Sequence, residues 1–187
     1  MSEILAALYR GDEAAAAELL AGGPELDVFE AAATGRVERL RELLEADPSL
    51  VGAWASDGFT PLHLAAFFRR PAAARLLVER GAPVDVVARN EEIPVTPLQS
   101  AVTAGERETA ALLLARGADP NFRHGGGFTP LHTAARNGDA GAVELLLANG
   151  AAPALADDEG RMPADFARDA GHESLAERLE RAAAARS

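Results

Sequence analysis

An apolar pattern recurs six times along the chain, and a turn residue marks the middle of each copy. These marks are spaced 24, 34, 36, 33 and 33 residues apart: Gly11, Gly35, Arg69, Gly105, Gly138 and Gly171. Eight residues after the marks stand Leu19, Leu43, Leu77, Leu113, Leu146 and Leu179. Four residues before them stand Ala7, Ala31, Ala65, Ala101, Ala134 and Ala167. Because such spacings place apolar residues on one helix face, each copy predicts a helix, a tight turn and a second helix.

A single pair of short helices cannot bury its own leucine stripe. The copies are therefore expected to stack side by side, which predicts an all-α fold, an α-solenoid of about six repeats. Between one copy and the next lie stretches such as 84–95 and 121–128, which hold turn formers and no helical periodicity. We expect these stretches to form extended, hairpin-like fingers.

The whole chain, residues 1–187, is predicted to form one domain. Within that domain the repeats define six approximate units. We expect the first two to be degenerate and the first and last to act as caps. Glu180 supports the terminal position of the last unit, since earlier units carry an apolar residue there. The predicted unit boundaries are 1–25, 26–58, 59–94, 95–127, 128–160 and 161–187.

Short motifs at the start of the first helices resemble the ankyrin repeat. Residues 60–66 read Thr-Pro-Leu-His-Leu-Ala-Ala and residues 129–135 read Thr-Pro-Leu-His-Thr-Ala-Ala, while residues 96–101 and 162–167 are variants. The signature and its 33-residue period are characteristic of that family. In this motif Thr caps the helix and Pro occupies its first turn, where no amide hydrogen is needed. The resemblance covers essentially the whole chain.

The resemblance carries expectations for particular residues. It implies that His63 and His132 hydrogen-bond locally and tie neighbouring turns together. Arg69 occupies a position where the other units have Gly, so either it adopts an unfavourable backbone conformation or the turn is remodelled ahead of Pro71. The finger before the fourth unit carries three extra residues within 89–94, at a place where ankyrin proteins vary their binding surface.

Charge and composition narrow the classes of partner. The chain has 187 residues, 29 acidic and 18 basic, with a net charge of −11 and no Cys. A nucleic-acid or anionic-membrane partner is therefore disfavoured, because both select clustered positive charge. No disulfide or thiolate metal site is available. The N-terminus does not read as a signal or transit peptide and no apolar run is long enough to span a membrane, so we expect a cytoplasmic protein.

The sequence offers little catalytic chemistry. The four histidines lack a zinc-ligand spacing, the serines lie outside a nucleophile elbow, and 125–127 lacks the spacing of a phosphate-binding loop. Residues 157–159 read as a solvated turn rather than a calcium loop. We therefore predict no enzyme activity, no catalytic residue, no metal and no cofactor. His124 alone lacks a motif that explains it.

An interaction surface remains, which the resemblance places on the concave face made of finger tips and first helices. Six of the nine aromatic residues fall on or beside the third to fifth fingers. Trp and Arg are enriched at binding hot spots. Transferred through the repeat register, the candidate partner-binding residues are Trp54, Ser56, Phe59, Phe67, Phe68, Arg89, Glu91, Glu92, Ile93, Arg123, His124, Phe128, Arg136, Asn137, Arg161 and Arg168.

Three functions follow as hypotheses. The first is a protein-binding adaptor, scaffold or inhibitor, a monomer whose acidic surroundings steer a basic partner. The alternative is a small-molecule or metal-binding protein or minor enzyme that uses the cluster of His124, Arg123 and Arg136. The third is a structural role through self-association. For Phe59, Phe122 and Phe128, packing between neighbouring fingers and contact with a partner both stay open.

Overall fold

The computed structural model describes residues 1–185; Arg186 and Ser187, at the end of the last predicted unit, lie outside the described residues. The described part is all-helical and contains twelve α-helices. They are α1 (Glu3–Tyr9), α2 (Glu13–Ala21), α3 (Val28–Thr34), α4 (Val37–Ala46), α5 (Pro61–Phe67), α6 (Pro71–Glu79), α7 (Pro97–Ala104), α8 (Arg107–Ala115), α9 (Pro130–Arg136), α10 (Ala140–Ala148), α11 (Pro163–Asp169) and α12 (Glu173–Ala184). Short 3₁₀ turns occupy Pro48–Gly52 and Gly125–Gly127.

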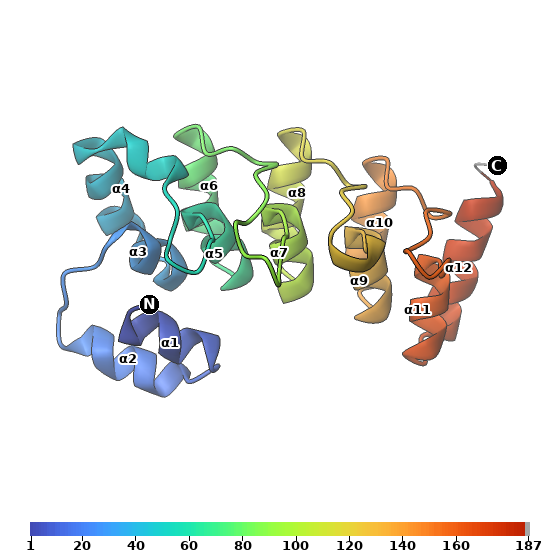
Figure 1. Ribbon diagram of the computed structural model, residues 1–187, viewed down its shortest axis with the longest axis horizontal. Helices are drawn as coiled ribbons and strands as arrows, with labels where there is room; N and C mark the ends of the chain where they lie inside the picture. Colours follow the sequence, from blue (N-terminus) through green and yellow to red (C-terminus); the bar gives the residue numbers. More distant parts are fainter. Residues whose placement is uncertain (186–187) are drawn as a thin grey trace.

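From α3 onward the helices form two parallel rows, as Figure 1 shows. The inner row consists of α3, α5, α7, α9 and α11, each packed on the next. The outer row follows through α4, α6, α8 and α10, and α12 closes the end against α11. This arrangement confirms the predicted helical solenoid.

The core lies between the rows, where the repeated apolar positions meet. The leucines at the second-helix position are fully buried in the middle of the row, as Leu77, Leu113 and Leu146 show. The alanines four residues before each mark are also fully buried. A side chain of one carbon there lets adjacent inner helices approach closely, so the small residue is a packing requirement of the stack.

Helix starts and turns follow the motif. Thr60 and Thr96 accept hydrogen bonds from the backbone amides of the third helical residue, and Pro61 and Pro97 fill the first helical position. Arg69 has a φ of 60°, the single non-glycine residue in the left-handed region within residues 1–185. The first of the two expectations for Arg69 is therefore confirmed, and the turn keeps the geometry that Gly supplies elsewhere.

The first helix pair departs from this row. Figure 1 shows α1 and α2 below the inner helices, joined to α3 by the stretch 22–27. Helix α1 packs on α2 and contacts α3, while Tyr9 at its end reaches past α3 to the third unit. Helix α2 buries Ala16 fully and leaves Leu19 and Leu20 half-buried. The N-terminal pair thus covers the surface of the row near α5 instead of lengthening it.

Candidate partner-binding surface

Four fingers project beside the inner helices, and each closes with the same backbone hydrogen bond. The amides of Ala55, Ala88, His124 and Asp157 donate to the carbonyls of Phe59, Val95, Phe128 and Arg161 at 2.8–2.9 Å. Three of these loops are five residues long from donor to acceptor, and the loop from Ala88 to Val95 is three residues longer. We call the surface formed by these fingers and the inner helices α5, α7, α9 and α11 the finger face.

Neighbouring fingers are fixed to one another through the backbone. The Arg89 amide donates to the Gly58 carbonyl at 2.8 Å, and the Asn90 side-chain amide donates to the Asp57 carbonyl at 3.0 Å. A Cβ at Gly58 would lie 2.6 Å from the Arg89 carbonyl carbon, so only glycine permits this approach. The long finger is therefore held rigidly against the one before it.

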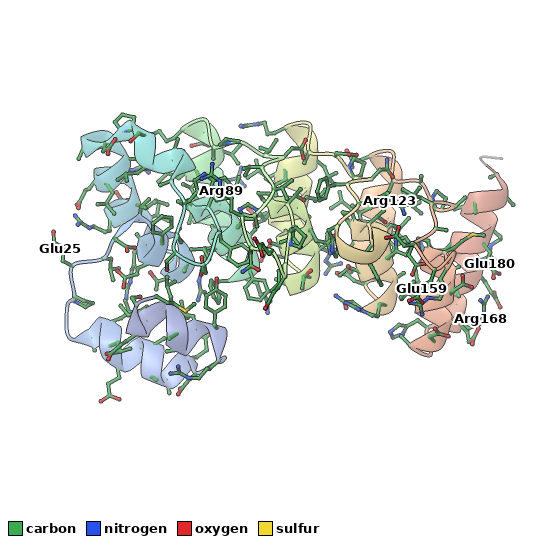
Figure 2. The ribbon with its side chains drawn as sticks, in the orientation of Figure 1. Glu25, Arg89, Arg123, Glu159, Arg168 and Glu180 are labelled. Atoms are coloured by element: carbon green, nitrogen blue, oxygen red, sulfur yellow. The ribbon has the colours of Figure 1, made fainter. Side chains whose placement is uncertain are left out.

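The finger closed by Ala55 and Phe59, called the first finger below, meets the long finger through Trp54 and Arg89. The guanidinium of Arg89 lies 4.2 Å from the centre of the half-buried Trp54 ring, a cation–π contact. Ser56 is exposed, while Phe59 is half-buried beside His63 and packs against the core. Figure 2 shows Arg89 on the finger beside α5.

An aromatic cluster lies at the end of α5. Tyr9 packs against both Phe67 and Phe68, with ring centres 6.2 and 5.1 Å apart. Phe68 is half-buried against the core, whereas Phe67 is 40% exposed. The Tyr9 hydroxyl donates to the Asp57 carboxylate at 3.1 Å, so one side chain joins the end of α5 to the first finger. Burial and the nearby Asp57 carboxylate raise the pKa of Tyr9 above its ordinary value.

An apolar pocket of about 180 Å³ opens on the finger face between α5, α7 and the long finger. Ile93 at its edge is 50% exposed. Glu91 and Glu92, which precede it, are exposed as well. The residues lining the pocket are Tyr9, Phe59, His63, Leu64, Phe67, Ile93, Val95, Ser100 and Thr103.

Of the candidates between residues 123 and 137, Arg123 and Phe128 are engaged within the protein. Arg123 donates to the Asp158 carboxylate and to the Ala156 carbonyl, both at 2.7 Å, which joins two fingers (Figure 2). Phe128 stacks edge-on against Phe166 at 5.1 Å, so it packs between neighbouring units. Arg136 and Asn137 are exposed at the end of α9.

His124 is half-buried beside Phe128, and its Nε2 atom is buried without a hydrogen-bond partner. Burial lowers its pKa, and the positive charge of Arg136 lowers it further. The structure therefore places Arg136 within electrostatic reach of His124 but directs Arg123 toward Asp158.

The sixth-unit candidates form ion pairs. Arg161 is half-buried, with its guanidinium 4.2 Å from the Phe166 ring and close to Asp157 and Glu159. Arg168 pairs with Glu180 on α12, as Figure 2 shows at the C-terminal end of the row. Arg161 thus pairs with carboxylates at the end of the preceding unit, and Arg168 pairs with one of its own unit.

His63 and His132 occupy the positions that the motif assigns them. Nδ1 of each histidine lies 2.8 Å from the hydroxyl of the capping Thr60 or Thr129. Nε2 donates to the carbonyl of the residue that begins the next unit, at 3.0 Å to Val95 and 3.2 Å to Arg161. The expectation that these histidines tie neighbouring units together is confirmed.

Burial lowers the pKa of His63 to about 4 and also lowers that of His132. Both rings are therefore neutral at pH 7. In the fourth unit Gln99 takes the same position, and its amide donates instead to the Thr133 hydroxyl at 2.7 Å. One of the three ties between units therefore does not titrate.

Tyr9 and Asp57 are the functional candidates that sequence analysis missed. Tyr9 stands two residues before its mark, the same offset at which the candidates Phe67 and Arg136 stand. The register thus contains a signal for Tyr9, although the sequence predicts the first unit only as a cap. No local pattern indicated that Tyr9 meets a finger 48 residues away.

Within residues 1–185, no group of three or more His, Cys, Asp or Glu residues lies close enough to hold a metal ion. In the same residues, every helix is too short or too polar to cross a membrane.

The sequence matches known families along most of its length. A model described as ankyrin repeats (3 copies) matches residues 28–124, and one described as ankyrin repeats (many copies) matches residues 112–167.

Similar proteins include a probable E3 ubiquitin-protein ligase, XBOS31, of Oryza sativa subsp. japonica, 40% identical over 96 residues, which are 51% of this chain and 21% of that protein. Palmitoyltransferase Hip14 of Drosophila melanogaster is 38% identical over 52% of this chain and 15% of its own length. Ankyrin repeat and SAM domain-containing protein 6 of Rattus norvegicus is 34% identical over 55% of this chain and 11% of its own. This chain therefore spans about a fifth or less of each of these relatives.

Proposed function

Because the chain belongs to the ankyrin-repeat family, whose repeats are generally protein–protein interaction modules, we propose that it is an adaptor, scaffold or inhibitor that holds a partner protein on its finger face. The observation that supports this surface is the exposure of Phe67 and Ile93 around one apolar pocket. Exposed apolar side chains gathered at one place are typical of interaction sites.

The finger face also has the rigidity that a binding surface needs. Backbone hydrogen bonds join the long finger to the finger before it, and His63 joins α5 to the same finger. Side chains on such a scaffold lose little conformational entropy when a partner binds, so more of the contact energy appears as affinity. The proposal includes no enzymatic step.

Affinity capture from the native cell lysate tests the proposal with three baits. These are the unmodified chain, a Phe67→Ala/Ile93→Ala variant of the finger face, and a Glu79→Ala/Arg116→Ala control. The control residues are exposed on the outer helices α6 and next to α8. Phe68 is unsuitable for this test because its packing against the core would confuse lost binding with lost folding.

We expect a protein that the unmodified chain and the control retain and the finger-face variant loses, identified by mass spectrometry. Equal retention by all three baits would place the partner elsewhere on the molecule. If all three baits capture nothing, the adaptor proposal fails.

A further inference from the structure

The pocket beside Tyr9 has no polar group free for a ligand except at its open edge. Both ring nitrogens of His63 are used, by Thr60 and by the Val95 carbonyl. The Tyr9 hydroxyl donates to Asp57, and the Ser100 hydroxyl donates to the Thr96 carbonyl at 3.2 Å. A polar group placed inside would lose its water and gain no hydrogen-bond partner there, which is unfavourable. The pocket therefore selects an apolar occupant.

The size of the pocket limits that occupant to something small. Sites for drug-sized molecules usually measure about 300–1,000 Å³, whereas this pocket measures about 180 Å³. An apolar side chain of a docked protein, anchored in a desolvated pocket, is a typical interaction hot spot. The dimensions thus fit one anchoring side chain better than a metabolite.

The charged residues beside the pocket indicate which residues of a docked protein would flank the apolar side chain bound in the pocket. Asp57 lies at the Tyr9 side, and Glu91 and Glu92 precede Ile93 at the other. Within the part of the chain that the structure describes, these three carboxylates have no ion-pair partner. Arg10 and Arg69 belong to turns at the C-terminal ends of α1 and α5, away from the fingers. Arg89 lies on the long finger, but its guanidinium stacks on the Trp54 ring. The finger end of the pocket is therefore acidic.

The acidic edge is also fixed in place. The Asn90 carboxamide oxygen accepts from the amides of Glu92 and Ile93, both at 3.0 Å, and its NH₂ group donates to Asp57's carbonyl. This one side chain closes the turn of the long finger and attaches it to the first finger. The two glutamates and Ile93 thus keep their position beside the pocket without a ligand.

We propose that this pocket binds a single apolar side chain of a partner protein, in a segment whose Lys or Arg residues lie toward Asp57, Glu91 and Glu92. The inference rests on the proposed function and specifies the chemistry of its partner. Tyr9 makes the site particular to this chain, because the displaced N-terminal helix pair supplies one wall of the pocket. Opposite charge along the edge would speed encounter and fix the orientation of the segment.

A random peptide library displayed on phage, selected on the full chain, supplies the probes. An enriched peptide is then synthesised and its Kd measured by fluorescence anisotropy with the unmodified chain and three variants. Ile93→Asp places a charge at the pocket edge, and Val87→Asp makes the same change at an exposed residue of the same segment that does not line the pocket. Glu91→Lys/Glu92→Lys reverses the acidic edge.

We expect enriched peptides that carry an apolar residue within a few positions of Lys or Arg. Ile93→Asp and the charge reversal should each raise Kd by about tenfold or more, and Val87→Asp should leave it nearly unchanged. Added salt should weaken binding to the unmodified chain more than to the charge-reversed variant.

The inference fails if the enriched peptides are acidic or lack an apolar anchor, or if none is enriched. It also fails if Ile93→Asp affects binding no more than Val87→Asp does. In these cases the wider proposal still stands when affinity capture finds a partner that the finger-face variant loses. When capture also fails, both proposals fall together.

Discussion

The two ends of the molecule consist of the same helix–turn–helix unit but pack in different ways. At the C-terminal end α11 packs on α9, α12 packs on α11, and Leu179 is 1% exposed. At the N-terminal end Leu19, at the same register position, is half-buried, and Tyr9 reaches across to the third unit. A regular helical pattern therefore determines the unit, while the surface it meets determines where the unit docks.

The connections to the rest of the row explain part of this difference. The last unit follows a finger that ends in Arg161, whose carbonyl accepts a hydrogen bond from His132. The first unit precedes α3 through the short stretch 22–27 and has no finger in common with its neighbour. Its attachment depends on apolar contacts and on the bond from Tyr9 to Asp57.

The largest expected effect is a difference in the free energy of unfolding between substitutions of Leu179 and Leu19, which occupy the same register position. Leu179→Ala removes a fully buried side chain and should lower the free energy of unfolding by about 3 kcal/mol. Leu19→Ala removes a half-buried one and should cost about 1 kcal/mol. Urea unfolding followed by circular dichroism measures both. Equal losses would show that the N-terminal pair is packed as tightly as the end of the row.

Acid should lower the free energy of unfolding because His63 becomes protonated. Its pKa is about 4 in the folded protein and about 6.5 unfolded, so the unfolded chain binds the proton more readily. The contribution of neutral His63 to the free energy of unfolding is fully present above pH 6.5. It declines by up to about 3 kcal/mol as the pH falls toward 4. His63→Gln, which copies Gln99 of the next unit, should reduce this decline, and Gln99→His should increase it. Urea unfolding at pH 7, 6 and 5 provides the measurement. An unchanged pH slope in both variants would contradict this account.

Alkali should lower stability through Tyr9 of the N-terminal helix pair, the only tyrosine of the chain. The pKa of Tyr9 is raised, so the folded protein holds its proton more tightly than the unfolded chain and loses stability as the pH rises above about 10. Tyrosinate absorbance at high pH reports this ionisation directly. Asp57→Asn should move the midpoint down, since it removes a charge that opposes ionisation, but burial keeps it above the ordinary value. A wild-type midpoint at the ordinary value would show that Tyr9 is not buried against Phe67 and Phe68.

The smallest expected effects concern two turns. One turn, at Arg69, lies beside the N-terminal helix pair, and the other, at Gly171, lies in the last unit. Arg69→Gly removes the left-handed strain next to the N-terminal pair and should stabilise the protein by about 0.5–1 kcal/mol. Gly171→Ala, at a φ of 81° with open space around the added Cβ, should destabilise it by about 1 kcal/mol. Thermal unfolding of both variants measures these shifts. Destabilisation by Arg69→Gly would mean that the arginine side chain makes a compensating contact.

The candidate site was predictable in part. The family resemblance, transferred through the repeat register, predicts Phe67 and Ile93 as candidate contacts, and both residues line the same pocket. The same reasoning gave Arg123 and Phe128 as contacts but could not show that Arg123 pairs with Asp158 or that Phe128 packs on Phe166. Those partners lie more than 30 residues away, and a repeat pattern carries no information about which long side chains meet across fingers.

The sequence by itself determined the repeating helix pairs, the capped helix starts and the histidine ties, because each depends on residues a few positions apart or one repeat apart. The left-handed turn at Arg69 was one of two outcomes that the sequence allowed. Only the tertiary structure decided where the first helix pair docks and that Tyr9 completes a pocket with α5 and α7. That docking results from complementary shape and one hydrogen bond between residues 48 positions apart, for which the chain holds no periodic signal.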